Sequence, residues 1–153
     1  MKKLVKEKNT FSILIAEDDP DDALMIKEAF EENTILNTLY FVEDGEQLMD
    51  YLLRRRKYNN TELYPTPGMI LLDLNMPKKD GREALKELKS HNVLRRIPVI
   101  VLTTSKAEED VIKSYDLGVS GFITKPVTFV DMVRFIKIMG KYWLEIVELP
   151  PQK

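Results

Sequence analysis

Polar side chains that could do metal and phosphoryl chemistry follow four short apolar runs of this sequence. They are three consecutive acids after the first run, an aspartate after the third, a hydroxyl after the fourth and an amine after the fifth: Glu17, Asp18, Asp19, Asp73, Thr103 and Lys125. Clustered carboxylates repel one another unless a cation lies among them, and Mg²⁺ held by carboxylates leaves coordination positions for a phosphate. An arrangement in which Asp73 attacks a phosphoryl group beside Mg²⁺, with Lys125 as a second positive charge, uses all of these residues.

Some of these residues also have a simpler structural explanation. Asp19 precedes a proline at the start of a helical pattern, where it is expected as the N-cap. Thr103 can be an ordinary strand-end hydroxyl. By contrast, Asp73 follows four apolar residues, where an unpaired carboxylate is unfavourable, and Glu17 and Asp18 precede the cap. The combination is therefore more specific than any one of its members.

The elements that would position these residues alternate between short apolar runs and helical patterns. The runs predict five strands, at 11–16, 38–42, 69–72, 98–102 and 121–124. Apolar periodicity and caps predict five helices, one starting after Asp19 and the others at about 45–57, 81–90, 106–117 and 128–147. This order predicts a doubly wound α/β fold, in which ligands bind beyond the carboxyl ends of parallel strands.

Length and composition limit the class of protein. The 153 residues, with 23 Lys+Arg against 25 Asp+Glu, predict one domain over 1–153, with a core at about 11–143 and an extension at 144–153. The absence of cysteine excludes thiolate metal sites and disulfide scaffolds. The near-zero net charge disfavours non-specific nucleic-acid binding. No apolar run is long enough to span a membrane, and the absence of cysteine fits a reducing cytosol, so we expect a cytoplasmic protein. At this length we expect no effector domain.

Four motifs that contain these residues resemble the receiver domain of two-component response regulators. They read ILIAEDD at 13–19, LDLNMP at 72–77, VLTT at 101–104 and GFITKP at 121–126. The resemblance covers Ser12 to about Trp143 and implies a flavodoxin-like sheet of five parallel strands in the order 2-1-3-4-5, with five helices. Three further segments, 18–22, 72–83 and 102–110, are most similar to the single-domain subgroup that partners bacterial phytochromes and related sensor kinases.

The resemblance implies a role for each acid. Asp73 is expected to accept a phosphoryl group from the phosphohistidine of a sensor histidine kinase. Asp18, Asp73 and the main-chain carbonyl of Asn75 are expected to bind Mg²⁺, with Glu17 acting through water. Because three acids are consecutive, Asp19 could also contribute. The protein is then a phosphorelay component that assists its own phosphorylation and dephosphorylation, and is not an enzyme that turns over a metabolite.

The resemblance also implies how phosphorylation is sensed. Lys125 is expected to pair with the phosphoryl oxygens, after a cis peptide bond into Pro126. Thr103 is expected to donate to a phosphoryl oxygen and draw its loop inward, and Phe122 to follow as the switch aromatic. Signalling would then depend on a surface that changes with phosphorylation.

The last predicted helix carries two apolar stripes. The first is expected to pack in the core and consists of Phe129, Met132, Val133, Ile136, Met139 and Trp143. The second lies elsewhere on the helix and consists of Phe135, Ile138, Tyr142 and Ile146. An exposed stripe of this kind usually marks a protein interface, although the chain's own tail could cover it. With the resemblance, it predicts a homodimer through the fourth helix, fifth strand and fifth helix.

Other interpretations remain open. A pseudo-receiver would bind partners without being phosphorylated, although it would not need the acids, Thr103 and Lys125. A haloacid dehalogenase-type phosphatase would need an acid at Asn75, since an amide cannot protonate a leaving group. The basic run at 54–57 is either a solvated helix end or a docking patch, and the predicted loop at 59–68 has no readable role.

Overall fold

A five-stranded parallel sheet forms the centre of the computed structural model, which describes residues 11–74, 76, 78–79, 81–103 and 119–142. The strand order is β2-β1-β3-β4-β5, as predicted. The strands are β1 (Ile13–Ala16), β2 (Leu39–Val42), β3 (Met69–Asp73), β4 (Val99–Thr103) and β5 (Gly121–Thr124). The helices are α2 (Pro20–Glu32), α3 (Gly45–Leu52), η1 (Arg56–Asn59), α4 (Gly81–Lys89), η2 (Leu94–Arg96) and α6 (Phe129–Met139). The helix predicted at 106–117 lies outside the described residues.

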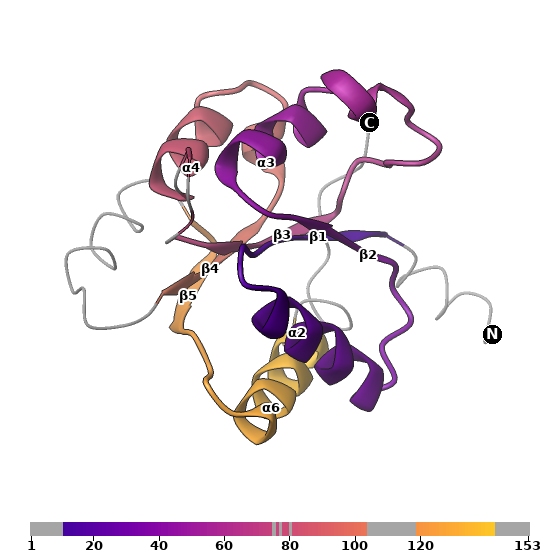
Figure 1. The fold of residues 1–153 in the computed structure, drawn as a ribbon, viewed down its shortest axis with the longest axis vertical. Helices are drawn as coiled ribbons and strands as arrows, with labels where there is room; N and C mark the ends of the chain where they lie inside the picture. The colour runs from indigo at the N-terminus through magenta and orange to yellow at the C-terminus, as the bar shows by residue number, and fades with distance from the viewer. Residues whose placement is uncertain (1–10, 75, 77, 80, 104–118, 143–153) are drawn as a thin grey trace.

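Two helical layers enclose the sheet. Helices α3 and α4 cover one face, and α2 and α6 cover the other (Figure 1). Successive side chains of a strand point to opposite faces, so Leu14 packs beneath α3 and α4 while Ile15 packs beneath α2 and α6. All five residues of β3 are buried, as predicted for a central strand. The parallel register places the end of β1 beside the end of β3.

Side-chain caps define where α2 and α6 begin. The Asp19 carboxylate accepts a hydrogen bond from the Asp21 N–H at 2.8 Å, and Pro20 occupies the first turn of α2. The Thr128 hydroxyl accepts one from the Asp131 N–H at 3.1 Å at the start of α6. Asp19 is therefore the predicted N-cap, and α2 begins almost immediately after β1.

The segment after α3 differs from the sequence prediction. Helix α3 ends at Leu52 and not near residue 57, because Arg54 adopts a left-handed φ of 62°. Arg55 and Arg56 fold back so that each Nε lies 2.9 Å from one oxygen of the buried Asp50 carboxylate. The basic run is thus not the end of a helix, although the Arg55 and Arg56 side chains remain largely exposed. It closes on the acid of its own helix.

Four tyrosines hold the predicted loop against α3. The ring of Tyr51 contacts those of Tyr40, Tyr58 and Tyr64, with centroids 6.0, 5.1 and 5.7 Å away. The Tyr51 hydroxyl donates to the Pro65 carbonyl at 2.9 Å, and burial raises the pKa of Tyr51 above its usual value. The 53–68 segment is therefore an insert that contains η1 and is held against α3 by its tyrosines.

Helix α6 confirms one predicted stripe in part. Met132, Ile136 and Met139 are buried beneath the sheet and Val133 packs partly against the same core, but Phe129, the first residue of the helix, is exposed. The α-helix ends at Met139, followed by a π-type turn at 140–142. Residues 143–147, at the predicted end of the helix, lie outside the described part of the chain.

The second stripe is also only partly as predicted. Ile138 and Tyr142 are 64% and 52% exposed. Phe135 is instead half-buried and packs against the core beneath α2 and α6. Ile146 lies outside the described residues. The exposed apolar surface of α6 is thus narrower than the sequence predicted.

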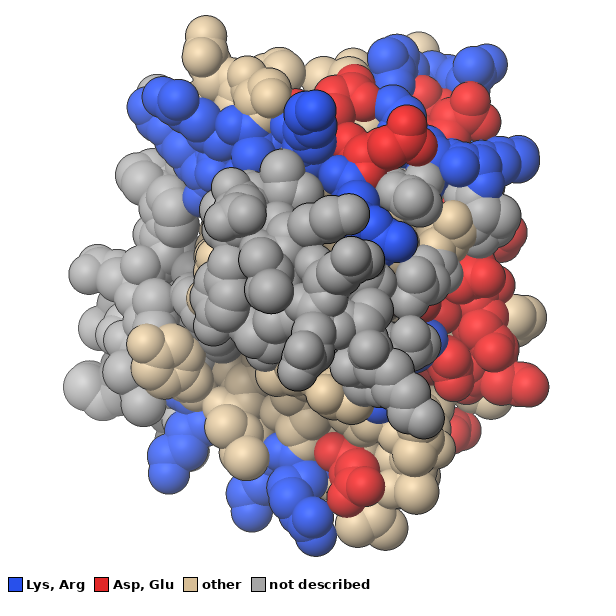
Figure 2. Space-filling view, turned by 90° about the vertical axis from the view of Figure 1, so that its left-hand side faces the viewer, with Lys and Arg blue, Asp and Glu red and all other residues tan. Residues whose placement is uncertain are grey.

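The near-zero net charge conceals an uneven surface. In Figure 2, Lys and Arg side chains are prominent over the upper part of one face, on the side of the α3 and α4 layer, with some acids among them, and Asp and Glu side chains gather along its right-hand edge. None of the described helices is both long and apolar enough to cross a membrane.

Candidate functional site

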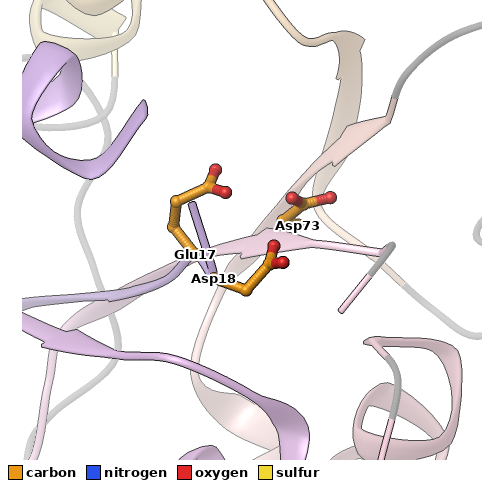
Figure 3. A group of neighbouring side chains, drawn as sticks. All are labelled: Glu17, Asp18 and Asp73. Atoms are coloured by element: carbon orange, nitrogen blue, oxygen red, sulfur yellow. The ribbon is translucent and has the colours of Figure 1, made fainter. Parts of the chain in front are cut away.

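Three predicted acids meet at the carboxyl ends of β1 and β3. Ala16 pairs with Leu72 in the sheet, so Glu17 and Asp18 emerge from β1 beside Asp73 at the end of β3. Figure 3 shows the three carboxylates turned toward a common space. One oxygen from each lies within 4.8 Å of the others. Parallel strands that end at one level therefore bring together residues more than fifty positions apart.

The donor set suits a hard divalent cation. Glu17 and Asp73 are buried, and Asp18 is exposed at the rim. Carboxylate oxygens with one open side match Mg²⁺ or Mn²⁺, which keep several waters and bind through one or two carboxylates. The Glu17 carboxylate belongs to this group, and its predicted action through water stays a prediction. Asn75, the fourth predicted ligand, lies outside the described residues.

The Lys125 ammonium enters the same group from the end of β5. Its Nζ lies 2.8 Å from Glu17 Oε1, 2.8 Å from Asp22 Oδ2 and 3.1 Å from Asp73 Oδ2. No cis peptide bond occurs among the described residues, so the predicted cis bond into Pro126 is wrong and the bond is trans. A trans peptide bond is the intrinsic preference even before proline. With this trans bond, the Lys125 side chain still reaches the acids.

Burial sets the protonation behaviour of the site. Burial raises the pKa of Glu17 to about 7, and the negative charge of Asp73 adds to this, although the contact with Lys125 opposes it. For Lys125, burial alone would lower the pKa. Its contacts with Asp22 and Glu17, together with the charge of Asp73, outweigh burial and hold the pKa above its usual range. The lysine therefore stays protonated while Glu17 titrates near neutrality.

Sequence reasoning missed Asp22. It had been explained only as an acid in the first turn of α2, where acids are common. The usable signal was the short β1–α2 connection, because a helix that starts three residues after Glu17 presents its first turn to the strand ends.

Two glycines contact the backbone at and after Asp73. The Gly81 N–H donates to the Leu74 carbonyl at 2.9 Å, and a Cβ at Gly81 would lie 2.5 Å from the Asp73 carbonyl oxygen. The Gly45 N–H donates to the Lys79 carbonyl at 2.8 Å. The segment after the acid is thus attached to the start of α4 and to the start of α3.

The two remaining predicted residues lie on neighbouring strands. Thr103 ends β4, next to β3, where Asp73 pairs with Leu102. Phe122 lies in β5 and pairs with Val101. The backbone of Thr103 lies at the expected edge of the sheet, and that of Phe122 lies in the expected strand. The side chains of both residues lie outside the described part of the structure.

Comparisons with known proteins agree with this geometry. The family model of the response regulator receiver domain matches residues 13–137. Response regulator Rcp1 of Synechocystis is 44% identical over 138 residues, covering 90% of this chain and 92% of that protein. The phosphorylated cyanobacterial phytochrome response regulator RcpA superposes with a TM-score of 0.86 at 41% identity, covering 93% and 99% of the two chains. The Mn²⁺-bound form of Rcp1 gives 0.83 at 42% identity, covering 92% and 99%.

Proposed function

This chain belongs to the response regulator receiver domain family, whose members are phosphoacceptors, and from that premise we propose that Asp73 is the residue phosphorylated by a sensor histidine kinase. The observation that carries the assignment is the burial of Asp73 between two further acids and the Lys125 ammonium. A carboxylate oxygen of Asp73 attacks phosphorus. The new O–P bond forms as the donor's N–P bond breaks, and the histidine nitrogen leaves with the electron pair.

Glu17, Asp18 and Asp73 hold the divalent ion, which we take to be Mg²⁺, with the main-chain carbonyl of Asn75 as a further ligand. Bound there, Mg²⁺ supplies charge neutralisation at the phosphoryl oxygens. The hard oxygen donors support this choice. Rcp1 has been crystallised with Mn²⁺, an ion of the same ligand preference.

Lys125, Thr103 and Phe122 have the remaining proposed roles. Lys125 donates to a phosphoryl oxygen, for which its contact with Asp73 is a suitable starting point. Thr103, at the neighbouring strand end, donates to another phosphoryl oxygen, and Phe122 follows it inward. The protein functions as a receiver domain over 1–153 in the cytoplasm and signals by changing its surface, without turning over a metabolite.

Intact mass after incubation with Mg²⁺ and acetyl phosphate tests the assignment of Asp73. We expect the wild type to gain one phosphoryl group, and Asp73→Asn to gain none. The control is Asp50→Asn, since Asp50 is also a buried carboxylate but lies between two arginines. Circular dichroism verifies that this variant is folded, and we expect it to gain one phosphoryl group as the wild type does. A mass gain that persists in Asp73→Asn, or that never appears in the wild type, contradicts the proposal.

We also propose a phytochrome-like sensor kinase as the donor and a homodimer as the assembly. RcpA is a phytochrome response regulator and covers nearly the same length of chain. Ile138, near the end of α6, and Tyr142, in the π-type turn that follows it, are exposed apolar residues that a second copy could bury. The dimer would use this helix together with β5 and the 106–117 helix.

Sedimentation equilibrium tests the dimer. Ile138→Glu combined with Tyr142→Glu should reduce a dimeric mass to that of a monomer, because two charges would be buried in the interface. The matched control is Val93→Glu, an apolar residue that is 53% exposed just before η2. It should leave the mass unchanged. Equal masses for the wild type and the double variant contradict the proposed interface.

A further inference from the structure

Asp22 differs from the other acids that contact Lys125. The Lys125 Nζ lies within ion-pair distance of three carboxylates, those of Glu17, Asp22 and Asp73. Glu17 and Asp73 also belong to the group of carboxylates that can hold a metal ion, whereas Asp22 does not. Asp22 is thus a partner of the lysine alone, supplied by a different element, α2.

Two positive charges would share the same carboxylates in a loaded site. Glu17 and Asp73 belong to the group that can hold an ion, and the Lys125 Nζ lies 2.8 and 3.1 Å from one oxygen of each. Since like charges repel, the ammonium must give up part of these contacts. The contact with Asp22 at 2.8 Å involves none of these oxygens. It can persist throughout metal binding and phosphoryl transfer.

Resting on the proposed function, we propose that Asp22 is a positioning residue for Lys125. It draws the ammonium toward α2, so that the lysine leaves Glu17 and Asp73 to the metal ion and still faces the phosphoryl group on Asp73. Lys125 is only 11% exposed and Asp22 is 31% exposed, so the ion pair is partly sheltered from water. It therefore constrains the lysine more than a surface pair would.

The neighbouring acid provides a matched control. Asp21 lies in the same first turn of α2 and carries the same charge, but its side chain is exposed and makes none of the contacts of Lys125. Asp21→Asn and Asp22→Asn change the net charge and the acidity of the helix start equally. A difference between the two variants isolates the contact with Lys125.

The experiment measures Mg²⁺ affinity by isothermal titration calorimetry and the rate of phosphorylation by acetyl phosphate at saturating Mg²⁺. We expect Asp22→Asn to weaken Mg²⁺ binding about fivefold and to slow phosphorylation by a similar factor, as for loss of a partly sheltered ion pair. Asp21→Asn should stay within about twofold of the wild type in both. Thermal melting of each variant verifies folding. Equal effects of the two substitutions would overturn the proposal.

The same substitutions in a Lys125→Met background separate positioning from simple charge. Without the ammonium, Asp22→Asn should weaken Mg²⁺ binding no more than Asp21→Asn does. If the extra effect of Asp22→Asn persists there, Asp22 acts on the ion directly and the proposal is wrong. If the wild type takes up no phosphoryl group, the proposed function fails, while the calorimetric comparison still decides the role of Asp22.

Discussion

Two groups of buried acids in this molecule have opposite charge balances. At the carboxyl edge of the sheet, the single ammonium of Lys125 contacts three carboxylates. Near the end of α3, one carboxylate, Asp50, contacts two guanidinium groups of the insert that follows. The negative charge of Asp50 is fully neutralised by its two partners, so this contact serves the structure alone. The carboxylates at the sheet edge outnumber their cation and can bind a further one, and this excess of negative charge distinguishes the functional site from the structural contact.

The largest expected contrast concerns folding. Asp50→Ala removes two charge-assisted hydrogen bonds that close the insert, so the free energy of unfolding should fall by roughly 2 to 3 kcal/mol. Asp73→Asn removes repulsion with Glu17, so in metal-free buffer the free energy of unfolding should stay the same or rise. Urea denaturation measures both. If Asp73→Asn proves as destabilising as Asp50→Ala, the contrast between the two groups is wrong.

A smaller effect should appear in the pH dependence of stability. Because the pKa of Glu17 rises from 4.5 to about 7 on folding, the folded metal-free protein binds its proton more tightly than the unfolded chain. This stabilisation is complete below pH 4.5 and is lost as the pH rises through about 7.

The variant Glu17→Gln lacks this proton. Its free energy of unfolding relative to the wild type should therefore increase from pH 5 to pH 8, by on the order of 1 to 2 kcal/mol. Urea denaturation in chelator at several pH values measures the difference, with Glu46→Gln on α3 as an exposed control. A difference that stays flat across this range argues against a buried, titrating Glu17.

The smallest single effects should come from the arginines. Arg55→Ala or Arg56→Ala alone leaves Asp50 one partner, and both arginines are largely exposed, so each should cost less than about 1 kcal/mol. The double variant should cost more than the sum, because the acid then has no partner. Urea denaturation completes the cycle, with the exposed Arg96→Ala as a control. Strict additivity would show that the two arginines do not share the acid.

Features that depend on residues close together in the sequence, or on the common edge of parallel strands, could be predicted, whereas other contacts between distant residues were missed. The strands, the cap at Asp19 and the meeting of Glu17 with Asp73 were predictable, because local pattern fixes each strand and parallel strands end at one edge. Asp22 was missed because a first-turn acid has a sufficient local explanation. Its contact with Lys125 spans the chain.

The sequence prediction for the insert after α3 was wrong for a related reason. Arginine and lysine favour helix, so continuing α3 through residues 54–57 was the best local choice. Tertiary contacts decided otherwise, since Asp50 gathers the two arginines and Tyr51 gathers the other rings. Neither contact produces a repeating pattern in the sequence from which it could have been predicted. The same limit applies to Phe135, whose partial burial depends on how α6 is rotated against the sheet.

The close approach of Gly81 to Asp73 has a mechanical consequence. Since not even a methyl group fits between Gly81 and the Asp73 carbonyl, the main chain at Asp73 and the first turn of α4 must shift together. At the other end of α4, the Lys89 ammonium donates to the carbonyls of Arg95 and Ile97, just before β4. This nine-residue helix, roughly 13 Å long, is thus a strut fastened at both edges of the sheet. We therefore expect a displacement of the main chain at Asp73 to reach the start of β4 through this helix.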